Sequence, residues 1–125
     1  MPHPVPDYRT RSFAFACDIV RLYQALVPSI PALPARQLLR AGTSIGANLE
    51  EAKPAQSRKD LIAKFSIALK EARETSYWLR LLIATSLGPK PLIEPALAEA
   101  NELVAILTTS VRRLKESKKD PPRGT

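Results

Sequence analysis

Apolar residues recur at intervals of three and four along four stretches of this chain, the spacing that gathers them on one face of a helix. The stripe of the first stretch consists of Phe13, Ala16, Val20, Tyr23 and Val27, widened by Ile19, Leu22 and Leu26. The second stripe consists of Leu38, Gly42, Ile45, Leu49 and Ala52. The third and fourth run from Leu61 to Ile83 and from Ile93 to Leu114. Each predicted helix therefore has an apolar face that another helix must cover.

Twelve prolines separate these stretches. Proline inside a helix removes a hydrogen bond and clashes with the preceding turn, so it collects at helix starts and in loops. The stripes and the prolines together predict helices over about 11–27, 35–53, 58–87 and 92–117. Because the linkers are short, we expect an all-α, antiparallel up-down-up-down four-helix bundle. The bundle would span 10–117, between a proline-rich tail (1–9) and a basic tail (118–125).

Local signals support two of the helix ends. Ser57 and Asp60 resemble a capping box at the start of the third helix. Gly88, directly before Pro89, is a candidate C-cap at the end of that helix.

The second stripe is unusually rich in small residues. They are Ala41, Gly42, Ser44, Gly46 and Ala47. Two glycines inside a helix cost about 1 kcal/mol each relative to alanine, so we expect a close approach by a neighbouring helix to offset that cost. The same segment matches the G-x-S-x-G motif of α/β hydrolases, which needs a strand before the serine and a histidine after it. Here the segment is predicted helical and the only histidine precedes it, which argues against a hydrolase.

The residue inventory argues against metal and redox chemistry. With one cysteine, Cys17, and one histidine, His3, the chain cannot form an internal disulfide or a zinc site of Cys and His ligands. A di-iron site needs Glu-x-x-His pairs, and no predicted helix carries a histidine. We therefore expect no metal, no cofactor, no catalytic residues, no small-molecule substrate and no enzymatic activity.

Polar residues border the apolar stripes of the second and third helices. Asn48 and Glu51 are three residues apart and share one face. Glu74 on the third helix is placed to meet them or a cation such as Arg40. We interpret these residues as a hydrogen-bonded layer that sets the register between helices.

The formal net charge is +7, from 19 Lys and Arg against 12 Asp and Glu. Positive charge concentrates in 57–87 and 111–125, and the segment between them is acidic. Part of this gradient complements the helix dipole. The remainder suits a polyanion, with nucleic acid as the expected ligand. The candidate contacts are Arg58, Lys59, Lys64, Arg73, Arg80, Arg112, Arg113, Lys115, Lys118 and Lys119.

A second apolar strip on the third helix indicates a subunit interface. Trp78 is offset by one position from the main stripe, and Ile67 and Leu81 lie on the same side. A helix that is apolar on two faces has to bury both. The alternative is that Trp78 folds over the edge of its own bundle.

Two segments resemble a known family. Ala41–Ala52 (AGTSIGANLEEA) resembles the S-I-x-A-N-x-x-E-A segment of the four-helix-bundle proteins encoded in intervening sequences of 23S ribosomal RNA. Phe65–Leu79 resembles the signature F-x-x-I/A-x-x-E-x-x-E-x-x-Y/W-L of the third helix of that family. The resemblance covers about 10–115. It implies a role in fold and packing for Gly42, Ser44, Asn48, Glu51, Phe65, Glu71, Glu74 and Trp78.

The family consists of small bacterial cytosolic proteins that assemble as homopentameric rings. It is also similar to the accessory bundle protein of diversity-generating retroelements, a basic pentamer that binds nucleic acid. The resemblance therefore implies a cytoplasmic homo-oligomer, with five copies favoured, and we expect RNA as its ligand. We expect no membrane association and no signal peptide, because the chain has no long apolar run and no apolar segment near its start. The alternative function is a protein–protein interaction scaffold whose positive charge serves only solubility.

Overall fold

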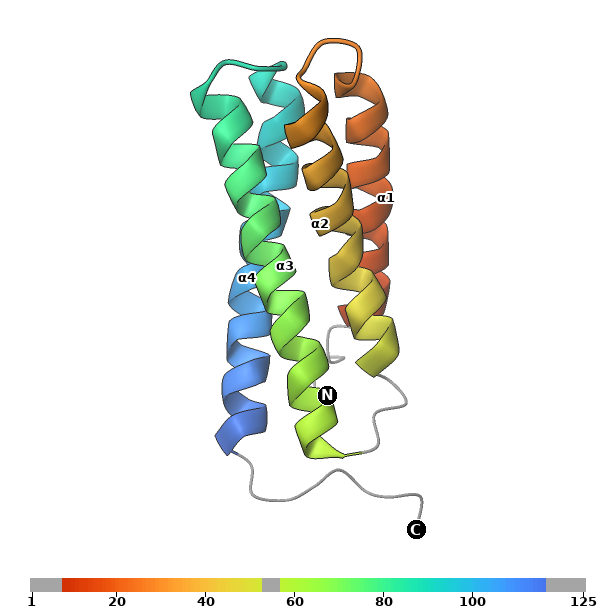
Figure 1. Ribbon diagram of the computed structural model, residues 1–125. Coiled ribbons are helices and arrows are strands. Elements are labelled where there is room, and N and C mark those ends of the chain that lie inside the picture. Colours follow the sequence, from red (N-terminus) through yellow and green to blue (C-terminus); the bar gives the residue numbers. More distant parts are fainter. Residues whose placement is uncertain (1–7, 53–56, 117–125) are drawn as a thin grey trace, which may run out of the picture.

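Four helices make up nearly all of the chain that the computed structural model describes, residues 8–52 and 57–116 (Figure 1). In chain order they are α1 (Tyr8–Leu26), α2 (Ala32–Ala52), α3 (Arg58–Ala84) and α4 (Lys90–Glu116). Each helix packs on the next, and α4 closes the bundle against α1 less tightly. α1 and α3 therefore lie at diagonal corners. The described residues contain no strand, and the predicted all-α up-down-up-down bundle is confirmed.

The two ends of α3 follow the sequence signals unequally. At its start, the hydroxyl of Ser57 accepts a hydrogen bond of 3.1 Å from the backbone N–H of Asp60, as the predicted cap requires. At its end the predicted C-cap is wrong, because Thr85 caps the helix before Gly88 is reached. Gly88 instead has a φ of 79° in the linker to α4, where a Cβ would lie 2.8 Å from the side chain of Leu26.

The core is built from one apolar stripe of each helix. On α2, α3 and α4 the predicted stripes face inward, and Leu38, Leu79 and Leu107 are completely enclosed. Leucine side chains of this kind contribute roughly 1.5–3 kcal/mol each on burial. Packing between these faces therefore supplies most of the stability of the bundle.

On α1 the predicted stripe is wrong in part. Ile19, Leu22 and Leu26, which widen it, are buried as expected, but three of its other members are exposed. The buried residues are Ser12, Phe15, Ile19, Leu22 and Leu26. Phe13, Val20 and Val27 instead face solvent, with exposed fractions of 66%, 40% and 43%. Both stripes have helical spacing, so periodicity alone does not distinguish them. The surface that α2 offers decides between them.

That surface is where the glycines of α2 meet α1. A Cβ on Gly42 would lie 2.8 Å from Cγ2 of Ile19 and 2.9 Å from its Cγ1, closer than real Cβ atoms come. A Cβ on Gly46 would lie 3.3 Å from the carbonyl oxygen of Ser12. The expected close approach of a neighbouring helix is confirmed at both positions, and the neighbour is α1.

We predict that Gly42→Ala destabilises the protein by about 1–2 kcal/mol. Alanine gains about 1 kcal/mol in helix propensity, but overpacking against the fully buried Ile19 costs more. Urea unfolding followed by circular dichroism measures the difference. In an Ile19→Ala background, which removes the colliding atoms, the same glycine substitution should become neutral or stabilising. An equal loss in both backgrounds would contradict a role for the contact.

Candidate nucleic-acid interface

A charged cluster joins α2 to α3. Nη1 of Arg40 lies 3.0 Å from Oε2 of Glu71, and Nη2 of the same guanidinium donates to Glu74. Nε1 of Trp78 also donates to Oε2 of Glu74, at 3.1 Å. Arg40 is thus the cationic partner that the sequence offered for Glu74. By bonding two carboxylates one turn apart, it fixes the register of α2 against α3.

This cluster is unsuited to acid–base chemistry. Burial opposes the charged form of Glu74, but hydrogen bonds from Trp78 and Arg40 outweigh it and lower the pKa of this carboxyl below its ordinary value. The hydrogen bond to Glu74 in turn raises the pKa of Arg40. A carboxylate that stays ionised and already has two donors is poorly placed to exchange a proton near neutral pH. The cluster is structural, as the sequence indicated.

The rest of the predicted polar layer has other partners. Nδ2 of Asn48 donates to the carbonyl oxygen of Ser44 at 2.8 Å, within α2. The carboxylate of Glu51 accepts a hydrogen bond of 3.0 Å from Nζ of Lys64. Of the two arrangements predicted for Glu74, the structure therefore contains the pairing with Arg40. Because Lys64 is engaged by Glu51, it is a weaker candidate for a phosphate contact than the other lysines.

The solvent side of α3 carries four cations, one in its first turn and three between residues 70 and 80. We call this surface the basic face of α3 and define it by Lys59, Lys70, Arg73 and Arg80, all exposed. None of the four forms an ion pair with another residue in the described ranges. Tyr77 lies between the two arginines and is 49% exposed. The basic face is therefore a row of unpaired cations with one aromatic ring in it.

Two members of this surface were not among the sequence candidates. Lys70 and Tyr77 follow the same spacing of three and four residues as Arg73 and Arg80. That periodicity was the available signal. Spacing alone does not show which side of the helix is open to solvent, or that Glu71 and Glu74 are bound by Arg40 of α2.

A second group of cations lies at one end of the bundle. α3 begins and α4 ends at this end (Figure 1), which brings Arg58 and Lys59 to the same end as the last turns of α4. Those turns contribute Arg112, Arg113 and Lys115, all exposed. Arg112 is 4.0 Å from Glu116, and Arg58 is partly buried. Lys118 and Lys119 lie outside the described residues.

α1 carries an uncharged apolar surface. We call Phe13, Val20 and Val27 the outer stripe of α1; they are spaced by seven residues, with Cys17 and Gln24 between them. Val27 directly follows the last residue of α1, and its N–H still donates to the carbonyl oxygen of Tyr23 at 2.9 Å. The strip predicted on α3 is less continuous. Trp78 is partly buried against the core, and Lys70 and Glu74 interrupt the strip.

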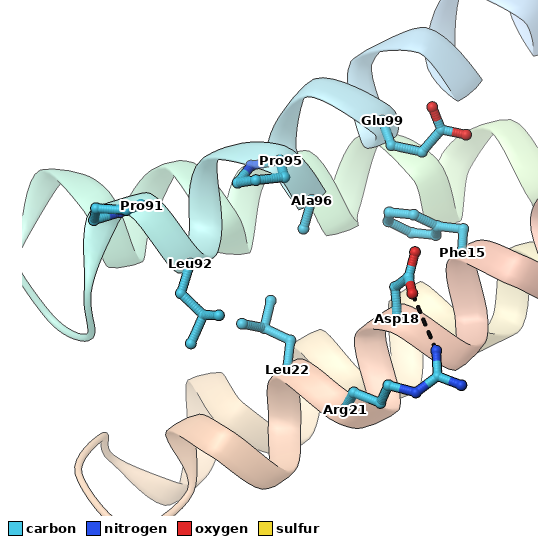
Figure 2. A pocket seen from close by; sticks show the side chains of 9 residues that line it. All are labelled: Phe15, Asp18, Arg21, Leu22, Pro91, Leu92, Pro95, Ala96 and Glu99. Atoms are coloured by element: carbon cyan, nitrogen blue, oxygen red, sulfur yellow. Dashed lines mark hydrogen bonds and ion pairs between the residues drawn. The ribbon is translucent and has the colours of Figure 1, made fainter.

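A hollow of about 340 Å³ separates α1 from the first turns of α4 (Figure 2). Its walls are mostly apolar, with Phe15, Leu22 and Leu92 among them. Its ionisable groups are already paired. Asp18 accepts from Arg21 at 3.2 Å, and Glu99 accepts two hydrogen bonds from Arg11, at 2.7 and 2.9 Å. The bonds from Arg11 lower the pKa of Glu99, so the hollow offers no free acid or base.

Comparisons with known proteins agree with this architecture. A family model described as 23S rRNA-intervening sequence protein matches residues 7–109. Among solved structures, the chain is similar to a protein with unknown function from the S23 ribosomal protein family of Bacteroides thetaiotaomicron. The two are 43% identical with a TM-score of 0.79, and the match covers 84% of this chain and 98% of that chain. No curated protein matches the chain.

Two kinds of feature are absent from the described residues. None of the four helices is long and apolar enough to cross a membrane. Within the same residues, no group of three or more His, Cys, Asp or Glu side chains is arranged to hold a metal ion.

We predict that Arg40→Met lowers stability by about 1 kcal/mol at pH 7, because Glu71 and Glu74 lose their cation. The loss is modest since the guanidinium is half exposed and its ion pairs are screened by water. The lowered pKa of Glu74 stabilises the fold above the ordinary carboxyl pKa, and this contribution disappears as pH falls through the folded-state value. The difference between the variant and the natural protein should therefore shrink between about pH 5 and pH 3 in urea titrations.

Arg21→Met is the matched control for this experiment. Among residues 8–52 and 57–116, Arg21 pairs only with Asp18, and its side chain is 73% exposed. Its replacement should change stability by less than about 0.5 kcal/mol at any pH. Equal losses for the two variants would contradict a special role for the Arg40 cluster.

Proposed function

Because this chain belongs to the family of 23S rRNA-intervening sequence proteins, we propose that it is a non-enzymatic protein that binds RNA as a homo-oligomer. The observation that carries the proposal is the basic face of α3. Its cations are exposed and unpaired among the described residues, although the chain has twelve acidic residues that could have neutralised them. A cationic surface of this kind matches the phosphate backbone of a nucleic acid.

A binding role fits the chemistry of the described residues better than a catalytic one. Several of their ionisable groups are joined in ion pairs between helices, such as Arg40 with Glu74 and Arg11 with Glu99. The hollow between α1 and α4 has apolar walls and paired charges. Neither the family nor the similar solved structure is described as enzymatic.

Self-association is supported by the outer stripe of α1. Three exposed apolar side chains at seven-residue spacing are typical of a helix that packs against another helix. We favour this stripe over Ile67, Trp78 and Leu81 because charged residues interrupt the latter. The stripe and the basic face lie on diagonal helices, so a contact through α1 leaves α3 open. A ring, with five copies favoured by the family resemblance, would repeat the basic face and strengthen weak contacts by avidity.

The scaffold alternative has support of its own. The outer stripe of α1 could cover an unrelated protein as well as a second copy of this chain. In that case the basic face would serve only solubility, and the purified protein would bind no RNA even at low salt.

We predict that the double substitution Arg73→Ala/Arg80→Ala weakens RNA binding by about tenfold. Each lost phosphate contact also lowers the slope of log affinity against log salt by roughly 0.7 for a single strand. Fluorescence anisotropy over about 50–200 mM salt measures both quantities.

The control for this pair is Arg21→Ala/Arg36→Ala, which removes the same net charge from exposed positions on α1 and α2. It should leave the salt slope nearly unchanged. If the protein binds no RNA at the lowest salt, the RNA-binding proposal is wrong, and the alternative of a protein–protein interaction scaffold is favoured.

We predict that Val20→Glu dissociates the assembly, because a charge in the middle of the outer stripe of α1 would have to be desolvated on association. Multi-angle light scattering should then report the mass of one chain, and circular dichroism should report unchanged helix content. Ile67→Glu, on α3, is the comparison variant and should keep the mass of the natural assembly. A natural protein that is already monomeric would contradict the assembly proposal.

A further inference from the structure

Tyr77 occupies an unusual position on the basic face of α3. It lies four residues after Arg73 and three before Arg80, so the two guanidinium groups are on the same side of the helix, one turn before the ring and one turn after it. The side chain is 49% exposed although it is aromatic. An aromatic ring between cations on an open surface is poorly explained by core packing.

The orientation of the Tyr77 ring is supported by side chains that lie between it and α2. Tyr77 packs edge-to-face on Trp78, with ring centroids 5.2 Å apart and an interplanar angle of 75°. Trp78 is itself anchored by its hydrogen bond to Glu74, which is held by Arg40. Tyr77 is therefore the outermost member of a connected series of side chains that reaches into the α2–α3 contact. Such support reduces the entropy that the ring would lose on stacking with a ligand.

Beside the ring is a shallow hollow of about 200 Å³. It is lined by Tyr77, Arg80, Leu81 and Ala84. This volume is below the roughly 300–1,000 Å³ of pockets for drug-sized ligands. It suits a single planar ring system lying on the surface better than a whole cofactor. The hollow is open to solvent, and Ala84 in its lining is exposed.

From this geometry we infer that the basic face binds single-stranded rather than double-stranded nucleic acid, with Tyr77 as a stacking platform for one unpaired base. Arg73 and Arg80, separated by roughly 10 Å along the helix axis, contact the phosphates on either side of the stacked base. Lys70 extends the same row by one turn. The inference rests on the proposed RNA-binding function and specifies the form of the ligand.

Base stacking on Tyr77 favours a single strand over a duplex. In a duplex both faces of every interior base are covered by neighbouring bases, so along the duplex an aromatic side chain on a helix surface has nothing to stack on. An unpaired base exposes its faces, and stacking on an aromatic ring contributes about 1–3 kcal/mol with little dependence on sequence. Phosphate contacts alone are available in both forms and do not discriminate between them.

The test compares two forms of one ligand. A fluorescein-labelled, unstructured 20-nucleotide RNA and the same RNA annealed to its complement are titrated with the natural protein, Tyr77→Leu and Tyr77→Phe. Leucine keeps an apolar side chain but removes the aromatic ring, whereas phenylalanine keeps the ring. The R73A/R80A double variant reports the electrostatic contribution in the same assay.

We expect the natural protein to bind the single strand at least tenfold more tightly than the duplex. Tyr77→Leu should weaken single-strand binding by roughly 5- to 100-fold and leave duplex binding unchanged, while Tyr77→Phe should behave as the natural protein. The double arginine variant should weaken both forms. Because Trp78 is the only tryptophan and touches Tyr77, its fluorescence should change on adding the single strand and much less on adding the duplex.

The outcomes separate this inference from the function on which it rests. If both RNA forms bind equally and Tyr77→Leu has no effect, while R73A/R80A still weakens binding, the stacking role is wrong and the RNA-binding function stands. Preference for the duplex would also overturn the stacking role. Absence of binding to either form at low salt would overturn both proposals.

Discussion

The missing side chain at Gly42 is the constraint on which the rest of this bundle depends. It allows the fully buried side chain of Ile19 to lie directly against the backbone of α2. Once Ile19 faces inward, the rotation of α1 is set, and Phe13 and Val20 must face solvent. One close approach between two helices thus decides both which residues complete the core and which apolar residues remain available to a partner.

The pairing of charges between helices has an equally broad effect. α3 carries acidic and basic residues, and within a lone helix Glu74 could neutralise Lys70 four residues away. In the bundle, Arg40 of α2 engages Glu71 and Glu74 instead. Glu71 and Glu74 are therefore bound on the side of α2, and Lys70, Arg73 and Arg80 are left without an ion pair among the described residues. The basic face of α3 lies diagonally opposite the outer stripe of α1, so assembly and ligand binding would use separate parts of the molecule.

Much of the fold could be predicted from the sequence because the signals are local. Helical spacing of apolar residues and the placement of prolines act within a few residues, and they led to the four helices and their order. The cap at Ser57 and the close packing at Gly42 could be predicted for the same reason. The end of α3 could not, since Thr85 and Gly88 lie in one linker and the contact with Leu26 that constrains Gly88 comes from another helix.

In the candidate site, too, some residues could be predicted from the sequence and others could not. Arg73 and Arg80 could be predicted from an excess of positive charge. Lys70 and Tyr77 are identified as part of this surface only from the structure, in which Glu71 and Glu74 pair with Arg40 of α2. By itself the sequence determined four amphipathic helices, their order and a positive net charge, because these are properties of residues close together in the chain. Only the tertiary structure decided which face of α1 is buried and which cations stay unpaired, because both depend on side chains that distant segments bring into contact.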